Sequence, residues 1–219
     1  GSVLPALETL DLWQSSDGLD GVQRLAEGLG AGALPAVTKL ELVNMHVGDV
    51  GASTLAAALG RGALPRLVDL NLNNTNIGNA GLVALAPVLQ RRSALETLNL
   101  ACNLFGDEGL AALVVPAPSA GAPPLSTGVL PKLEELDLRS TQMTDAGCAT
   151  LASALDSGAL PALEKLELDG TPARAAAKAA VYEARANLHE TVYETASEHE
   201  SGSEEDEGED DSGDGEEDD

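Results

Sequence analysis

Aromatic side chains are scarce in this chain of 219 residues, which has one Trp, one Phe and two Tyr. The hydrophobic core must therefore be built from Leu, Val and Ala, which lack the large buried area that aromatic rings provide. Side chains of this size suit thin, stacked layers better than one large core. The scarcity of aromatic residues thus argues against a single globular core.

Cysteines, long apolar runs and a leader sequence are also lacking. Cys102 and Cys148 are the only cysteines, too few for a disulfide framework, and this favours a reducing compartment. No stretch is apolar and long enough to span a bilayer, and the first residues lack the charged and apolar segments of a signal peptide. We therefore expect a cytoplasmic location, with a perinuclear or nuclear one as the alternative.

Basic residues are few. Lys and Arg total 12 against 36 Asp and Glu, which gives a formal net charge of −24. Residues 197–219 hold fourteen of these acids and no Lys or Arg, so the rest of the chain carries −10. An acidic body with an acidic tail argues against direct binding to nucleic acid and to anionic membranes. It favours a protein partner with a basic surface.

One pattern, Leu-x-x-Leu-x-Leu, returns six times along the chain and usually follows Leu-Pro. The copies begin at Leu7, Val37, Leu67, Leu95, Leu133 and Leu163, at intervals of 30, 30, 28, 38 and 30 residues. Self-similarity at such a period is typical of a solenoid, in which each unit buries its apolar face against its neighbours. Solenoids usually serve as binding surfaces, which makes recognition the first functional hypothesis.

The third and fifth copies show how one repeat is built. Leu70 and Leu72 alternate with polar residues, as in a short strand with one buried face. A turn at 78–81 follows, and the Asp or Asn of this turn in each copy is predicted to cap the helix after it. Apolar residues then recur at helical spacing, as Leu151 and Leu155 do. Each copy is therefore predicted to be a strand, a turn and a helix.

Six such units of about 28–30 residues predict an α/β fold. The expected architecture is a right-handed leucine-rich-repeat horseshoe solenoid, with parallel strands on the concave face and helices on the convex face. It is predicted over residues 1–173, with an insertion loop rich in Pro, Ala, Gly and Ser at 115–128. A C-terminal capping helix is predicted over 174–195, and the composition of 196–219 predicts a disordered acidic tail.

Three serines of the tail are candidate phosphorylation sites. Ser197, Ser201 and Ser203 each have an acidic residue three positions later, as acidophilic kinase sites do. Phosphorylation there would deepen the negative charge of the tail. The same spacing also arises by chance in any acidic run.

Outward strand positions are predicted to form a column across the concave face. An acidic column would steer a basic partner toward it, whereas the alternative is that any solvated strand carries polar residues there. Trp13, beyond the first strand, is either a contact residue or a cover for the open end of the first repeat. The candidate partner-binding residues are Asp11, Trp13, Glu41, Asn71, Asn73, Asn74, Asn99, Asp137, Arg139 and Glu167.

Motifs of catalysis and metal binding are not found in the sequence. It has no GxxxxGK[ST] phosphate loop and no GxSxG nucleophile elbow. The three histidines do not cluster with the two cysteines, and neither cysteine has a CxxC partner. We therefore predict no catalytic residue, no metal site and no cofactor, and expect a binding protein.

The repeat unit resembles the ribonuclease-inhibitor-like class of leucine-rich repeats. The resemblance rests on the 28–30 residue period and on the x-[Gly/Thr]-[Asp/Asn]-x-Gly turn, as in 106–109 and 144–147. At the position where the class usually has Asn, only Asn103 matches. Thr75 can replace part of the hydrogen bonding of that Asn, whereas Met45 cannot.

Repeats followed by a terminal helix and an acidic tail resemble the C-terminal half of the Ran GTPase-activating protein family. This resemblance implies a regulator that binds a small GTPase through its acidic concave face and supplies no arginine finger. The family's Asn-rich loop is similar to 73–78, with Asn74 as the best match. The alternatives are a recognition module with an unrelated partner and a histone-binding nuclear protein with an acidic tail. We expect a monomer.

Overall fold

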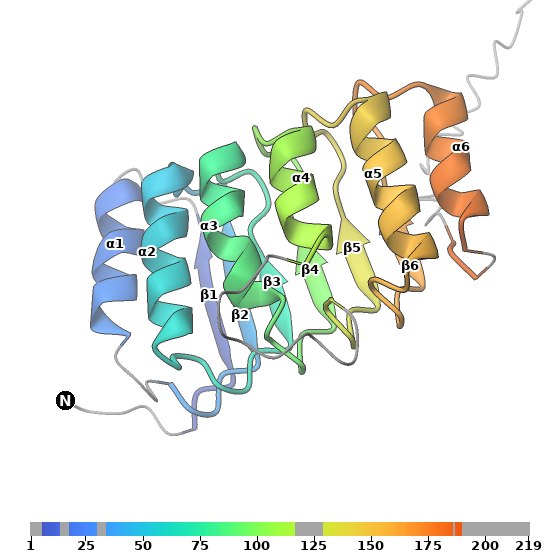
Figure 1. The fold of residues 1–219 in the computed structure, drawn as a ribbon. Coiled ribbons are helices and arrows are strands. Elements are labelled where there is room, and N and C mark those ends of the chain that lie inside the picture. Colours follow the sequence, from blue (N-terminus) through green and yellow to red (C-terminus); the bar gives the residue numbers. More distant parts are fainter. Residues whose placement is uncertain (1–5, 14–17, 30–33, 117–128, 186, 190–219) are drawn as a thin grey trace, which may run out of the picture.

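A computed structural model of the chain describes residues 6–13, 18–29, 34–116, 129–185 and 187–189. Within these residues, six strands alternate with six helices (Figure 1). The strands are β1 (Thr9–Trp13), β2 (Lys39–Val43), β3 (Asp69–Asn71), β4 (Thr97–Asn99), β5 (Glu135–Asp137) and β6 (Lys165–Glu167). The helices are α1 (Gly18–Gly28), α2 (Gly48–Gly60), α3 (Asn79–Leu89), α4 (Asp107–Val114), α5 (Asp145–Asp156) and α6 (Ala175–Glu183).

The strands form one parallel sheet in the order β1-β2-β3-β4-β5-β6. The register joins equivalent positions of successive repeats, so that Leu40 lies opposite Leu70, and Leu70 opposite Leu98. The helices form a second layer in which each packs on the helices of neighbouring repeats (Figure 1). The predicted α/β leucine-rich-repeat solenoid is thereby confirmed.

Leu side chains between the sheet and the helices form most of the core. Leu40 and Leu70 from the strands are fully buried, as is Leu55 from α2. Burying one such side chain contributes roughly 2 kcal/mol, so each repeat adds its own share of the stability. In the first strand, Leu10 and Leu12 are only partly buried, because β1 has no strand beyond it among the described residues.

The starts of four helices, α3 to α6, are capped by the preceding repeat, and for α6 Asp145 Oδ1 accepts from the backbone N–H of Arg174 (2.7 Å). Asp49, at the start of α2, accepts hydrogen bonds through Oδ1 from the backbone N–H groups of Gly78 (2.7 Å) and Gly81 (2.9 Å), at the start of α3. Asn79 does the same for α4, and Asp107 for α5. The prediction that this Asp or Asn caps its own helix is therefore wrong. The acceptor acts one repeat further along, because the side chain projects toward the neighbouring turn.

The buried side chain of Asn103 joins the third repeat to the fourth. Its Oδ1 accepts hydrogen bonds from the backbone N–H of Ile77 (2.9 Å) and from the Thr75 hydroxyl (3.1 Å). Its Nδ2 donates to the carbonyl oxygens of Leu72 (2.8 Å) and Leu100 (2.9 Å). The Thr75 hydroxyl also donates to the carbonyl oxygen of Leu72 within its own turn (2.8 Å). Thr thus replaces part of the bonding of Asn, as the sequence predicts.

The C-terminal helix is shorter than predicted. α6 ends at Glu183, whereas the sequence predicts that this helix continues to residue 195. Arg185 then turns toward the end of α5, and its Nη2 donates to the carbonyl oxygen of Ala159 (2.8 Å). His189 pairs with Lys165 in a parallel bridge beside β6. These contacts with α5 and β6 replace a continuation of the helix, which the local composition of the segment could not reveal.

Several predictions of domain organisation fall on other parts of the chain. Residues 190–195 of the predicted helix and the whole of 196–219, with Ser197, Ser201 and Ser203, lie outside the described residues. The same holds for 117–128, which is most of the predicted insertion loop. Their organisation therefore stays a prediction from the sequence.

Candidate functional site

The concave face of the sheet carries a column of six polar residues, one from each strand. Strand pairing places Asp11 opposite Glu41, Glu41 opposite Asn71, and so on along the sheet. The full column is Asp11, Glu41, Asn71, Asn99, Asp137 and Glu167. The geometry of the column follows the repeat pattern, while its role in binding stays a prediction.

The column side chains are held in place by their own backbone. Asn71 Oδ1 accepts a hydrogen bond from the N–H of Asn73 (3.0 Å), and Asn99 Oδ1 accepts one from Ala101 (3.0 Å). Asp137 does the same with the N–H of Arg139 (3.1 Å). Short polar side chains often bind the backbone two residues on and compete with regular structure. Here they take the N–H that a longer strand would use, which fits the three-residue length of β3, β4 and β5.

Basic side chains of the same face neutralise part of the acidic column. Arg139 forks onto Asp137, with its Nη2 2.7 Å from Oδ2 and its Nε 3.0 Å from Oδ1. Lys39 lies between Glu41 (3.0 Å) and Asp69 (3.3 Å). The face is therefore a patterned mixture of charges with an acidic excess, and not a continuous acidic strip.

The charged forms of the two partners, Lys39 and Asp69, are affected in opposite directions. The pKa of Lys39 is raised, first by its hydrogen bond to Glu41 and then, against desolvation, by Asp69. The pKa of Asp69 is also raised, because burial disfavours its charge more than Lys39 favours it. A raised pKa favours the charged form of Lys39 but disfavours the charged form of Asp69. The charge of Lys39 is therefore stabilised by its neighbours, whereas keeping Asp69 charged costs free energy.

The structure spreads the remaining candidate residues over this face and its rim. Trp13 is the last residue of β1 and not beyond it, and its side chain is 64% exposed. Asn73 is partly buried at the end of β3, whereas Asn74 is exposed. Glu167 is only 5% exposed, so it offers little surface to a partner. The expectation that it presents a side chain for contact is thus at odds with its burial.

Asn74, a candidate residue from the sequence, belongs to a row of polar side chains along the rim whose other members, Asn44, His46 and Asn76, were not singled out. The Nδ2 of Asn74 donates to Asn44 Oδ1 (2.8 Å), and the side chains of Asn76 and His46 lie 2.8 Å apart in a hydrogen bond. The signal that could have revealed it is the 30-residue spacing within each pair. This rim continues the concave surface beyond the ends of the strands.

The concave face is also hollowed between β4 and β6. A cavity of about 110 Å³ lies there, lined by Thr97, Asn99, Asp137 and Lys165 among others. Lys165 pairs with Glu135 at its edge. This hollow was not predictable from the repeat pattern, since it depends on the side-chain lengths of three successive strands.

Within the described part of the chain, neither a metal centre nor a membrane span emerges. No group of three or more His, Cys, Asp or Glu side chains in that part is arranged to hold a metal ion. Of the helices described, none is both long and apolar enough to cross a bilayer. Cys102 is exposed and Cys148 is buried, and both are free thiols.

Comparisons with known proteins agree with this architecture. A family model described as "Leucine Rich repeat" matches residues 65–86, 94–114 and 129–152. A solved structure of the leiomodin-1 actin-binding site 2 is similar, with a TM-score of 0.56 and 16% sequence identity, over 80% of this chain and 90% of that chain. No curated protein sequence matches the chain. At this identity the similarity to leiomodin shows the fold alone. The three matched segments are thus leucine-rich repeats, and they lie within the α/β solenoid of six strand–helix units.

Proposed function

We propose that this chain is a non-catalytic scaffold that binds a protein partner with a basic surface through the concave face of its sheet. The observation that carries the proposal is the column from Asp11 to Glu167, held in register over six strands. An extended, preformed surface of this kind loses little conformational freedom on binding. Its acidic excess would speed the encounter with a basic partner more than it would tighten the final complex.

The more specific proposal is that the partner is a Ran-like small GTPase and that the chain regulates its GTP hydrolysis. The support is the sequence resemblance, in which Asn74 occupies the best-matching position, together with the exposure of Asn74 on the rim. In this role the chain would orient groups of the GTPase and contribute no catalytic residue of its own. The proposal also includes a monomer in the cytoplasm, at the nuclear envelope or in the nucleus.

Two other partners belong in the same experiment. The similar leiomodin-1 structure is that of an actin-binding site, and an acidic tail after leucine-rich repeats is also a feature of histone-binding nuclear proteins. Neither partner is favoured by a contact or a cavity of this structure. Actin and histones therefore serve as comparison arms beside the GTPase.

The test uses variants that change the charge of the column while keeping its geometry. In Asn71→Asp and Asn99→Asp, the acceptor for the backbone N–H is retained and one negative charge is added. The matched control is Ala57→Asp, which adds the same charge at an exposed position of α2 on the convex face. Association rates with a Ran-like GTPase in its GDP and GTP forms, with actin and with histones are measured at two salt concentrations.

The proposal predicts faster association for each of the two single variants, Asn71→Asp and Asn99→Asp, with one of these proteins, and no change for the control. One added charge at contact distance in water is worth about 1 kcal/mol, which is about a five-fold change. The gain should shrink at high salt. Equal association rates for the two single variants and the Ala57→Asp control would rule out the concave face as the binding site. Binding of the GTPase without any effect on its GTP hydrolysis would remove the regulatory role and leave the scaffold.

A further inference from the structure

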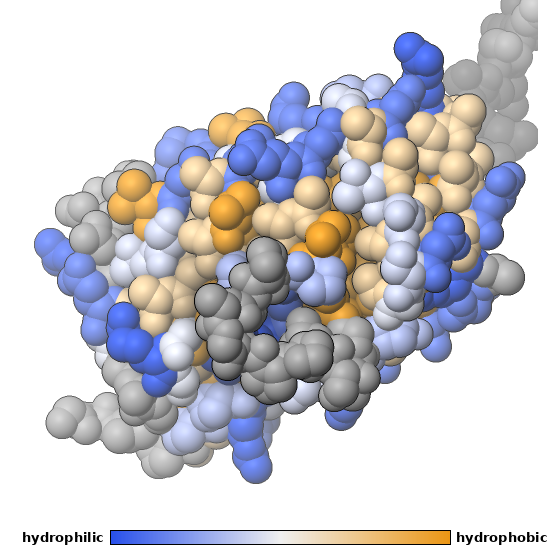
Figure 2. Space-filling model, viewed as in Figure 1, coloured by the Kyte–Doolittle hydropathy of each residue, from blue (hydrophilic) through white to orange (hydrophobic). Residues whose placement is uncertain are grey.

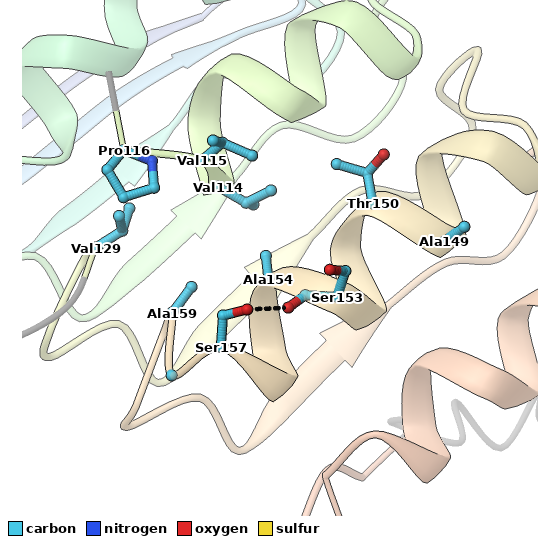
Figure 3. A pocket seen from close by; sticks show the side chains of 11 residues that line it. Val114, Val115, Pro116, Val129, Ala149, Thr150, Ser153, Ala154, Ser157 and Ala159 are labelled. Carbon is cyan, nitrogen blue, oxygen red and sulfur yellow. Dashed lines mark hydrogen bonds between the residues drawn. The ribbon is translucent and has the colours of Figure 1, made fainter. Parts of the chain in front are cut away.

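The helix layer contains a groove between the end of α4 and the side of α5. α4 has only 8 residues and ends at Val114, whereas α5 has 12. The C-terminal part of α5, with Ala154 and the following residue Ser157, therefore has no helix turn of α4 beside it. A cavity of about 730 Å³ lies there (Figure 3). It is a feature of the convex side that breaks the regular stacking of the helices.

The groove is uncharged in a strongly acidic chain. None of its eleven lining residues carries a charge, although 22% of the whole sequence is charged. Val114, Val115 and Val129 form one wall, and small side chains of α5 such as Ala149 and Ser153 form the other (Figure 3). Val115 is 47% exposed. In Figure 2, apolar residues gather over the helices on this side of the molecule. An apolar groove of this size is favourable for a ligand that is itself uncharged.

Both ends of one uncharged segment of the chain lie on this groove. The twelve residues 117–128 connect Pro116 to Val129, and both of these residues line the cavity. The segment has the sequence Ala-Pro-Ser-Ala-Gly-Ala-Pro-Pro-Leu-Ser-Thr-Gly, which contains no charged residue. Leu125 is its one large apolar side chain. The segment therefore matches the groove in polarity and is tethered to it on both sides.

We propose that residues 117–128 bind within the chain in the groove between α4 and α5, with Leu125 as their apolar contact. Tethering at both ends gives the segment an effective concentration in the millimolar range, so even weak contacts suffice. Its three prolines lower the conformational entropy that binding must remove. The groove thereby acts as an internal docking site, separate from the concave face and independent of the partner proposed for it.

The test compares the backbone amide NMR shifts of three forms of the full chain. These are the native chain, a chain in which 117–128 is replaced by a Gly-Ser linker of equal length, and the single variant Leu125→Ser. The proposal predicts shift changes at Ala149 and Ser153 of α5, and at Ser157 directly after it, in both altered chains. The internal reference is α2, where Ser53 and Ala57 occupy the positions equivalent to Ala149 and Ser153 and should not change.

Two results would overturn the proposal. Shift changes confined to the immediate neighbours of the altered segment, with α5 unmoved, would show that 117–128 does not occupy the groove. The shifts of α5 are also measured over a twenty-fold range of protein concentration, below the roughly millimolar effective concentration of a tethered segment. Shifts that depend on protein concentration would show that a second copy of the chain occupies the groove instead. A loss of dispersion in the linker chain alone would point to unfolding, and Leu125→Ser then decides the matter, since this change of one side chain leaves the backbone intact.

Discussion

The Oδ1 atom of Asp49 lies 2.9 Å from the backbone nitrogen of Gly81 and accepts its hydrogen bond. This approach requires glycine, because a Cβ at position 81 would lie 2.6 Å from the same oxygen. In the turns before α3, α4 and α5, where Gly81, Gly109 and Gly147 stand, the Asp/Asn-x-Gly pattern therefore combines two separate roles. The Asp or Asn acts on the next repeat, and the Gly makes room for the acceptor of the previous one.

The first prediction concerns this contact between repeats. We expect Gly81→Ala to lower the free energy of unfolding by about 2 kcal/mol, because its Cβ would also lie 3.0 Å from the side chains of Ala52 and Ile77. Asp49→Ala should cost about 1 kcal/mol through loss of the cap. Urea unfolding followed by circular dichroism measures both changes.

A double variant distinguishes the steric contact from general damage. In Asp49→Ala with Gly81→Ala, the shortest clash is absent, so the combined loss should be smaller than the sum of the two single losses. Gly60→Ala is the control, since a Cβ there meets only Val88 at an ordinary 3.5 Å. Strict additivity of the two changes would contradict the proposed contact.

The second prediction concerns Asn103. We expect Asn103→Ala to lower the free energy of unfolding by about 3 kcal/mol, because buried backbone groups of Ile77 and Leu100 lose the Asn103 side chain as partner and the Leu72 carbonyl keeps only the Thr75 hydroxyl. Thr141→Ala removes one hydrogen bond, to Leu138 (2.9 Å), and should cost about 1 kcal/mol. The two values come from the same urea titrations. A smaller loss at Asn103 than at Thr141 would refute its role as a junction.

The third prediction concerns a basic side chain at the end of α2. Arg92 donates through Nη1 to the carbonyl oxygen of Leu64 (2.7 Å) and through Nη2 to those of Leu59 and Ala63 (both 2.8 Å). Burial lowers the pKa of Arg92, and because a guanidinium stays charged in proteins, its positive charge is favourable at the end of the helix. Arg92→Met should therefore cost about 2 kcal/mol, and Arg92→Lys should recover only part of this.

A matched control for Arg92 comes from the second repeat. Arg61 makes a single long contact, with its Nη2 3.4 Å from the carbonyl oxygen of Ala26. Arg61→Met should change the melting temperature little in comparison with Arg92→Met. Equal shifts for the two variants would mean that the three carbonyl contacts of Arg92 contribute nothing specific.

The fourth prediction separates the two thiols. Cys102 is exposed, whereas Cys148 is buried, and this burial raises the pKa of its thiol. At pH 8 we expect one thiol to react quickly with a disulfide reagent and the second to react only as the chain opens, because the thiolate is the reactive form. Cys102→Ser should abolish the fast phase. Two fast phases in the native chain would contradict the burial of Cys148.

The fifth prediction uses the backbone conformation of the turns. Cys102 and Ser140 have φ angles of 57° and 54°, in the left-handed region that favours glycine. The equivalent positions of three other repeats hold residues suited to this region, namely Asn44, Asn74 and Gly170. We expect Cys102→Gly and Ser140→Gly each to raise the free energy of unfolding by about 0.5 kcal/mol. Ala101→Gly, outside this region, should lower it.

Features that follow from the repeat interval were predictable from the sequence. Once Leu40 and Leu70 are known to be equivalent, the pairing of Glu41 with Asn71 follows, because every residue of a parallel strand shifts together. The burial of Leu55 follows in the same way from helical spacing. In each case the information lies within one repeat and its copy.

Features that depend on contacts between different repeats were not predictable. The side chain of Asp49 caps the next helix because the turns of successive repeats lie close together in space. The sequence interval between the repeats does not give this distance. The end of α6 at Glu183 depends on carbonyl groups of α5 that Arg185 reaches, and not on helix propensity. The burial of Glu167, which is only 5% exposed, was likewise not predictable, because the polar alternation of the strand pattern predicts exposure at this position.

The exchange of helix-end partners between repeats has a consequence for how the molecule comes apart. α5 is contacted at its start by Asp107 of the preceding repeat, and at its end by Arg185, whose Nη2 donates to the carbonyl oxygens of Leu155 in the last turn (3.4 Å) and of Ala159 just beyond it (2.8 Å). A repeat cut out of this chain would lose partners at both ends at once. Neighbouring units should therefore melt together as one cooperative block.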